Sequence, residues 1–188
     1  MKASYDGRWK QWIVMGMLIC AGINASAAGI FYVVPGGTGA TGTSWADAFG
    51  SIQAAVNAAS TAGGGDVWVK VGTYTGSVDP VVSMAPFVSL YGGFAGTETF
   101  LNTRNWTANP TIIDGENARR CVTGASSAII DGFTITKGYV ANAGGGGMYN
   151  NACLGLTVSH CTFTDNHTAS LPADSGGGGR AVTQRLRH

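Results

Sequence analysis

The chain has 188 residues and a formal net charge of +1, with 11 Lys and Arg against 10 Asp and Glu. Charged residues make up only 11% of it, whereas 30 residues are glycine and 5 are proline. This charge balance argues against nucleic acid and anionic membranes as partners. Abundant glycine without a collagen period fits strands joined by tight turns rather than a helical bundle.

Residues 1–27 have the pattern of a secretory signal peptide. Three basic residues come first, namely Lys2, Arg8 and Lys10. An apolar run over 12–23 follows, and Ala25-Ser26-Ala27 supplies the small residues of a cleavage site. The run is too short for an ordinary membrane span, and an uncleaved anchor helix is the alternative. We therefore expect a secreted, extracellular or cell-surface (outer-membrane) protein without a transmembrane segment in its mature chain.

The segment 28–65 is predicted to hold an N-terminal strand at 30–35 and a capping helix at 46–62. Two residues fit a capping box at the start of the helix, Ser44 and Asp47. Four apolar residues follow at helical spacing, Phe49, Ile52, Val56 and Ala59. The three glycines at 63–65 are expected to end the helix, the only convincing one in the mature chain.

Between residues 66 and 179 the sequence predicts short strands with a period of two. The alternation is clearest at the first of these strands, where Val67, Val69 and Val71 alternate with Trp68 and Lys70. Further strands are expected to centre on four residues, Ser89, Ile112, Ile130 and Val158. These strands recur every 22 residues or so, about one turn of a stacked repeat each.

Two near-copies support a repeat architecture. Phe133-Thr-Ile-Thr-Lys and Cys161-Thr-Phe-Thr-Asp have the same alternation, and runs of four glycines follow them at 144–147 and 176–179. Such self-similarity is typical of stacked repeats. We expect a parallel β-helix of about four to five coils, with Phe133 aligned on Cys161, Ile135 aligned on Phe163 and the intervening threonines facing solvent. An antiparallel sandwich, the alternative, needs hairpin turns that these repeats do not suggest.

The last nine residues break this pattern. An arginine-rich sequence at 180–188 follows the second glycine run, whereas Met148-Tyr149-Asn150 follows the first. We interpret 180–188 as a non-homologous tail from a frameshift or a truncated gene, and a short natural basic tail is the alternative. A stack that stops there has an open last coil, which predicts self-association through exposed strand edges.

The cysteine and histidine spacing predicts neither a metal site nor a cofactor. Three cysteines follow the predicted cleavage site, namely Cys121, Cys153 and Cys161, and no Cys-x-x-Cys or Cys/His ligand spacing occurs. Cys161 is interpreted as a small buried hydrophobe. His160 is placed in a strand and His167 in a loop, with no nearby serine nucleophile.

Several motifs occur in a fixed order: Phe31-Tyr-Val-Val, Gly42-Thr-Ser-Trp-Ala-Asp-Ala-Phe49, Val67-Trp-Val-Lys-Val-Gly-Thr-Tyr74, Tyr91-Gly-Gly-Phe-Ala-Gly-Thr-Glu-Thr99, Arg104-Asn-Trp106, Ile130-Asp-Gly-Phe-Thr-Ile135 and Gly145-Gly-Gly-Met-Tyr-Asn150. Together they resemble the N-terminal region of secreted bacterial right-handed parallel β-helix repeat proteins. The resemblance is to the polymorphic outer-membrane-protein and autotransporter-passenger kind, within the pectate-lyase-like (pectin lyase-like) fold group. It spans about residues 30–179 and implies an all-β solenoid with an N-terminal α-helical cap.

This resemblance implies a secreted or cell-surface scaffold, an adhesin that contacts polysaccharide or cell-surface glycans, and a fragment of a longer protein. The alternative is a polysaccharide lyase or hydrolase of the same fold group. Its candidate carboxylates are Asp114 and Asp131, which occupy equivalent Ile-Ile-Asp-Gly positions on what we expect to be successive coils. Asp before Gly is an ordinary turn choice, so we assign both to turns and assign no catalytic residue.

Aromatic residues are the candidates for glycan contact. Trp106, Tyr74 and Trp68 are expected to stack on sugar rings if they face outward, and Tyr91 is a further candidate of the same kind. Trp106 is the strongest candidate because it lies in an excursion between strands, where recognition residues are common. The residue type by itself favours a packed aromatic that seals this loop, and sugar contact is the alternative role for Trp106.

Overall fold

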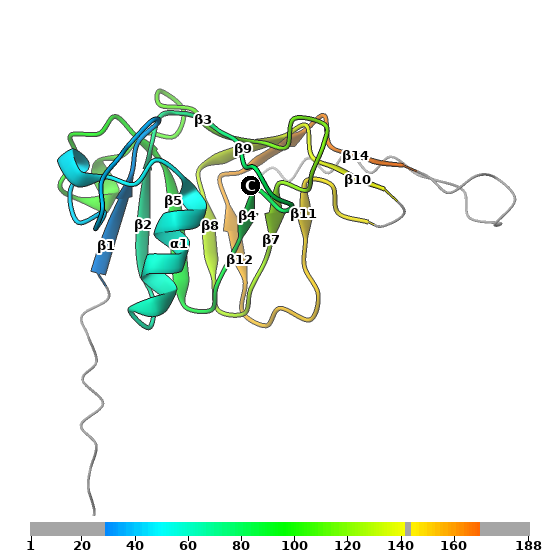
Figure 1. The fold of residues 1–188 in the computed structure, drawn as a ribbon, viewed down its shortest axis with the longest axis horizontal. Coiled ribbons are helices and arrows are strands. Elements are labelled where there is room, and N and C mark those ends of the chain that lie inside the picture. Colours follow the sequence, from blue (N-terminus) through cyan, green and yellow to red (C-terminus); the bar gives the residue numbers. More distant parts are fainter. Residues whose placement is uncertain (1–28, 142–143, 170–188) are drawn as a thin grey trace, which may run out of the picture.

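The computed structural model describes residues 29–141 and 144–169. Within these ranges the fold is all-β, with short strands in parallel sheets and one α-helix (Figure 1). The predicted signal peptide at 1–27, the second glycine run at 176–179 and the tail at 180–188 lie outside the described residues.

Four sheets organise the strands. The five-stranded sheet has the order β1 (Gly29–Val33), β2 (Gly65–Lys70), β5 (Val88–Phe94), β8 (Ile129–Asp131) and β12 (Thr157–Ser159). The four-stranded sheet contains β3 (Gly72–Tyr74), β6 (Thr111–Asp114), β9 (Phe133–Thr136) and β13 (Thr162–Thr164). The smaller sheets contain β4 (Val82–Ser83), β7 (Val122–Thr123) and β11 (Met148–Tyr149), and β10 (Tyr139–Ala141) with β14 (His167–Ala169).

Every ladder between these described strands is parallel, which excludes the antiparallel sandwich. From β2 onward the chain passes from the five-stranded to the four-stranded sheet, reaches the three-stranded sheet and then returns to the first. Neighbouring strands in one sheet are therefore separated in sequence by visits to the other sheets. Residues far apart in the chain thus meet on one face of a sheet.

The core lies between the sheets and is formed by alternate residues of each strand. In the four-stranded sheet, Tyr74, Ile113, Ile135 and Phe163 are successive ladder partners, which confirms the predicted alignment of Ile135 with Phe163. The ladder of β9 with β13 begins at Thr134 and Thr162, one residue after Phe133 and Cys161. Thr162 is exposed, as predicted, whereas Thr134 is half-buried.

The predicted strands centred on Ser89, Ile130 and Val158 are confirmed as β5, β8 and β12 of one sheet. Ile112 lies in β6, however, so the predicted series with a period of about 22 residues mixed two sheets. Within the five-stranded sheet, Leu90 pairs with Ile130, 40 residues later, because the excursion and a whole visit to the other sheets intervene. A single repeat length is therefore the wrong description of this chain.

The predicted helix at 46–62 is in fact two shorter helices. A 3-10 turn, η1 (Trp45–Asp47), precedes α1 (Ile52–Thr61), and each starts with a serine cap. Phe49 separates them, because its N–H donates to Tyr32 O at 2.9 Å and its carbonyl accepts from Val34 N at 3.0 Å. These bonds to the chain around β1 hold Phe49 in an extended conformation that a continuous helix excludes.

Helix α1 closes the N-terminal end of the core. Its buried side chains lie on one face, as predicted for an amphipathic helix: Ile52, Ala55, Val56 and Ala59. That face packs against β1, β2, β4 and β5 (Figure 1). The helix ends before Gly63, whose φ of 87° is in the left-handed region, so the predicted glycine stop is confirmed.

Candidate functional site

The outer face of the five-stranded sheet carries a row of large or polar side chains. Because Val67, Leu90 and Ile130 point into the core, the residues that follow them point outward. The ladder places five such residues side by side across the strands: Tyr32, Trp68, Tyr91, Asp131 and Ser159. Only the tertiary arrangement brings them together, since they span 128 positions of the chain from Tyr32 to Ser159 (159 − 32, counting both ends).

The excursion between β5 and β6, residues 95–110, adds two further side chains to this face. It contains the 3-10 turn η2 (Leu101–Thr103), directly followed by Arg104, with Trp106 two residues later. Asn105 fixes the segment: its N–H donates to Gly93 O at 2.8 Å, and its side-chain oxygen accepts from Thr107 N and Ala108 N. The excursion is therefore attached to β5 next to the site.

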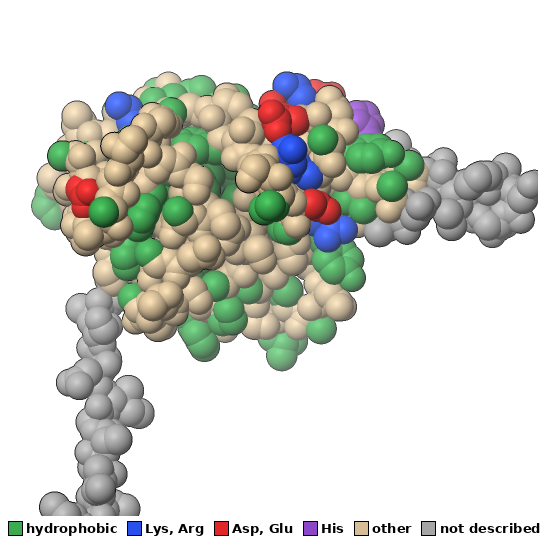
Figure 2. Space-filling view, in the orientation of Figure 1, with side chains coloured by type: hydrophobic (Ala, Val, Ile, Leu, Met, Phe, Trp, Pro, Cys, Tyr) green, Lys and Arg blue, Asp and Glu red, His purple; other side chains and the backbone are tan. Residues whose placement is uncertain are grey.

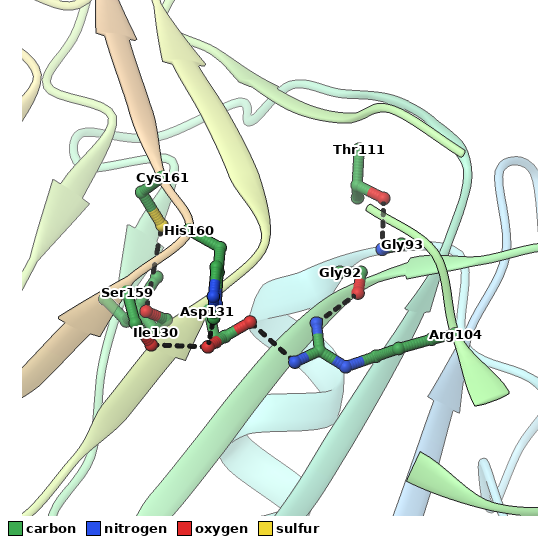
Figure 3. A network of polar contacts seen from close by, with 9 residues as sticks. All are labelled: Gly92, Gly93, Arg104, Thr111, Ile130, Asp131, Ser159, His160 and Cys161. Atoms are coloured by element: carbon green, nitrogen blue, oxygen red, sulfur yellow. Dashed lines mark hydrogen bonds and ion pairs between the residues drawn. The ribbon is translucent and has the colours of Figure 1, made fainter. Parts of the chain in front are cut away.

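Asp131 is the centre of a polar network on this face (Figure 3). Arg104 Nη2 lies 2.6 Å from Asp131 Oδ1, and Arg104 Nη1 donates to Gly92 O at 2.9 Å. Oδ2 of Asp131 accepts from the hydroxyl of Ser159 and lies 2.9 Å from His160 Nδ1. The side chains of Arg104 and Asp131 are only 8% and 10% exposed. This geometry is that of a mostly buried ion pair that links β8 to the excursion and to the end of β12.

The network lowers the pKa of the Asp131 carboxyl. Burial by itself raises that pKa, but the hydrogen bonds from Ser159 and His160 and the Arg104 guanidinium outweigh the burial. Asp131 is consequently ionised and fully engaged by its own neighbours.

A continuous stack of side chains lies beside this ion pair. The Arg104 guanidinium carbon is 5.2 Å from the centre of the Tyr91 ring and 5.0 Å from that of the Trp106 ring. The Trp106 ring is in turn 4.2 Å from the His160 ring. We call Tyr91, Arg104, Trp106 and His160 the Trp106 stack. Each contact lies in the range of cation–π or aromatic attraction, so the four side chains hold one another in place.

The polar network lacks the geometry of a nucleophilic triad. In a triad the serine hydroxyl bonds the histidine, which removes its proton. Here Ser159 and His160 both bond Oδ2 of Asp131 directly. Among residues 29–141 and 144–169, no group of three or more His, Cys, Asp or Glu side chains is placed to hold a metal ion. Because Ser159 and His160 bond the same carboxylate oxygen and not each other, His160 is not placed to take the proton of Ser159.

The two Ile-Ile-Asp-Gly segments take different places in the fold, which corrects the expectation that Asp114 and Asp131 stack. Asp114 lies in the four-stranded sheet opposite Thr136, whereas Asp131 lies in the five-stranded sheet between Tyr91 and Ser159. Asp114 accepts from Glu116 N at 2.8 Å, the turn role predicted for it, and also binds Lys137 Nζ at 2.8 Å. The turn role was wrong for Asp131, whose carboxylate partners are side chains.

Two of the three predicted glycan-contact residues are buried by other parts of the protein. Trp68 is 2% exposed and Tyr74 is 4% exposed, so neither ring offers a face to a sugar. Trp68 is covered by Phe94, stacked at 4.7 Å, and by Tyr32 at 5.7 Å, while Tyr74 packs in the core and donates its hydroxyl to Lys70 O at 2.8 Å. Trp106 is 38% exposed and is the one of the three that a ligand can touch.

Sequence reasoning missed Arg104, Ser159 and His160 as site residues. His160 was placed in a strand, but it lies between β12 and β13 with a φ of 48°, in the left-handed region. His167, predicted in a loop, belongs to β14. No local pattern marks His160 or Arg104, because their partner Asp131 lies 29 and 27 positions away.

Two further ion pairs of the described residues lie elsewhere, at Asp114 and at Glu116. Figure 2 shows acidic and basic side chains interspersed in a narrow band on this face, with further acidic and basic side chains outside the band. Arg119 pairs with Glu116, and Arg120 is engaged by the carbonyls of Gly144 and Gly145 at 3.1 and 3.0 Å.

The three cysteines of the described residues are free thiols. Cys121 is completely buried, and Cys161 is half-buried and packs against the core, close to the predicted role of a small hydrophobe. Burial raises the pKa of Cys121 to about 12 and that of Cys161 to about 11.

Comparison with protein-family models, with curated proteins and with solved structures finds no match for this chain. Across residues 29–141 and 144–169, no helix has the length and hydropathy needed to cross a membrane.

Proposed function

We propose that this chain is a secreted or cell-surface scaffold, a right-handed parallel β-helix that contacts glycans through the Trp106 stack. The order in which the strands visit the three larger sheets supports the β-helix, since each passage adds one parallel strand to each sheet. Right-handedness follows from the strong preference of parallel crossover connections. The predicted signal peptide supports export. We also propose that the protein self-associates through the edges of β12 and β13.

The observation that carries the glycan proposal is the exposed and prearranged ring of Trp106. A ring that contacts a sugar loses little conformational entropy on binding when its neighbours already fix it. Trp106 is fixed by Arg104 and His160, and Arg104 is itself held by Asp131 and Gly92. The excursion thus presents an aromatic edge on a rigid sheet, the usual arrangement for loop-borne recognition.

Polysaccharide lyase or hydrolase activity has less support. A hydrolase needs two carboxylates placed across one scissile bond, and a lyase needs a free base beside a Ca²⁺ site. Asp114 and Asp131 lie in different sheets, and each already has a cationic partner. Adhesive contact without cleavage is therefore the function that this geometry supports best.

The test is retention of the purified chain on a panel of immobilised neutral and acidic polysaccharides, with product release measured in parallel. We expect retention without cleavage, weakened about tenfold by Trp106→Ala. Phe100→Ala is the matched control, because Phe100 is an exposed aromatic on the same excursion and lies outside the stack. Retention that Trp106→Ala leaves unchanged, or release of shortened chains, contradicts the proposal.

A further inference from the structure

A second group of side chains continues the Trp106 stack along the outer face of the five-stranded sheet. Asp66 and Ser89 are ladder partners on β2 and β5, and Tyr91 follows Ser89 by two residues on the same face. Asp66 is close enough to Tyr91 for its charge to raise the pKa of the phenol, although burial raises it more. All three side chains are half-buried, so they are still accessible beside the more exposed Trp106.

Asp66 and the neighbouring Trp68 indole N–H lack part of the hydrogen bonding that they could make within the protein; we call Asp66, Ser89 and Tyr91 the Asp66 patch. Among the described residues, Asp66 has no ion pair, and the indole N–H of Trp68 is the side-chain donor that lowers the pKa of its carboxyl. That N–H lowers the pKa of Asp66 less than burial raises it, and it makes no hydrogen bond of normal geometry with any described group. A buried indole N–H and a half-buried carboxylate are thus left together without full satisfaction, which natural structures avoid unless a ligand or water completes the site.

The nearby cation is not available to an acidic ligand. Arg104 is bound to Asp131 and to Gly92 O, and its side chain is only 8% exposed. Lys70 lies four residues beyond Asp66 on β2, about 13 Å along the strand. A ligand carboxylate at this patch therefore meets the unpaired charge of Asp66 before it meets a free cation, and like charges repel.

We infer that the outer face of β2 and β5 is a binding site for a neutral, hydroxyl-rich glycan, with Asp66 accepting hydrogen bonds from its hydroxyl groups and Tyr91 and Trp106 contacting its ring. Sugar hydroxyls can donate to the carboxylate, while the apolar faces of the rings meet the aromatic side chains. This inference rests on the proposed glycan-contacting function and adds to it the class of glycan and a second contact.

The experiment is a calorimetric titration of the purified full chain with two probes of similar length, cellohexaose and hexagalacturonate. Cellohexaose is expected to bind at least about tenfold more tightly than hexagalacturonate. Asp66→Asn keeps the shape of the side chain but removes its charge, and it is expected to weaken cellohexaose binding about tenfold. Asp165→Asn, at an exposed turn after β13, removes the same charge elsewhere and is expected to leave binding unchanged.

Two outcomes distinguish this inference from the function on which it rests. Tighter binding of hexagalacturonate than of cellohexaose overturns the neutral class and leaves a glycan-contacting scaffold standing. If Trp106→Ala loses affinity for both hexasaccharides while Asp66→Asn binds as tightly as Asp165→Asn, only the role of Asp66 is overturned. Failure of the wild-type chain to bind either hexasaccharide or any immobilised glycan overturns both proposals. Melting curves of each variant confirm that a lost affinity does not reflect unfolding.

Discussion

Gln53 on α1 binds the backbone of Ser83 on β4 as a neighbouring strand would. Gln53 Oε1 accepts from Ser83 N at 2.6 Å, and Gln53 Nε2 donates to Ser83 O at 3.2 Å. β4 is the first strand of the three-stranded sheet, so one of its edges has no strand partner among those described. The side-chain amide satisfies that edge and covers it with the helix, a common way to protect a sheet from further pairing.

Gln53→Leu is expected to destabilise the protein by about 1 kcal/mol, because both backbone groups of Ser83 lose their partners. Chemical denaturation measures this change. Gln53→Glu is the informative control, since it keeps the acceptor for Ser83 N but loses the donor that Nε2 supplies to Ser83 O and to Asn57 Oδ1. Equal stability of the wild type and the leucine variant contradicts the edge-covering role.

Removing one partner of the Arg104–Asp131 pair is expected to be more costly. Asp131→Asn leaves a mostly buried guanidinium without its counter-charge, which typically costs about 3 kcal/mol. A double-mutant cycle with Arg104→Met measures the coupling between the two side chains. A coupling free energy near zero contradicts the view that this pair fixes the excursion.

The same aspartate predicts a pH dependence of stability. The pKa of Asp131 is lowered in the folded state, despite burial, by Ser159, His160 and Arg104. The contribution of Asp131 to stability is therefore fully present above its unfolded-state pKa of about 3.9 and is lost as the pH falls through the lower folded-state pKa. The stability difference between wild type and Asp131→Asn is expected to shrink below about pH 4. If the stability difference between wild type and Asp131→Asn grows as the pH falls, the folded-state pKa of Asp131 is raised rather than lowered.

Glu98 is expected to hold the start of the excursion. Its carboxylate accepts from the backbone N–H groups of Ala95 at 2.7 Å, Gly96 at 2.9 Å and Thr97 at 3.0 Å. Glu98→Gln is predicted to speed hydrogen exchange of these amides and to cost about 1 kcal/mol, because the neutral amide has one acceptor oxygen where these bonds use both carboxylate oxygens. Glu116→Gln serves as the control, since that carboxylate contacts only the Arg119 side chain among its described partners. Unchanged exchange in the Glu98 variant argues against this role.

Thiol labelling tests the buried cysteines. The raised pKa values of Cys121, about 12, and Cys161, about 11, leave almost no thiolate at pH 8. Iodoacetamide is therefore expected to label Cys153 in the native protein and to label Cys121 and Cys161 only after unfolding in urea. Peptide mass spectrometry reads the result for each residue. Native labelling of Cys161 as fast as Cys153 contradicts its packing against the core.

Much of the fold follows from local sequence patterns. Alternation fixes which face of a strand is buried, because successive side chains point to opposite sides, so β2, β5, β8 and β12 are predictable. The end of α1 follows from Gly63, which accepts the left-handed conformation. Its predicted start was wrong, because the predicted capping box at Ser44 belongs to the 3-10 turn and Ser51 is the cap of α1. The interruption at Phe49 is not predictable in this way, because its cause is pairing with β1.

The candidate site depends on tertiary structure. Residue pattern places Trp106 in an excursion and puts the two Ile-Ile-Asp-Gly segments at the ends of strands. It is the folded arrangement that buries Trp68 and Tyr74 and that brings Asp131, unlike Asp114, to Arg104 and His160. The physical reason is that local pattern sets which way a side chain points from its own strand. Strand register and the path of an excursion decide what it meets there.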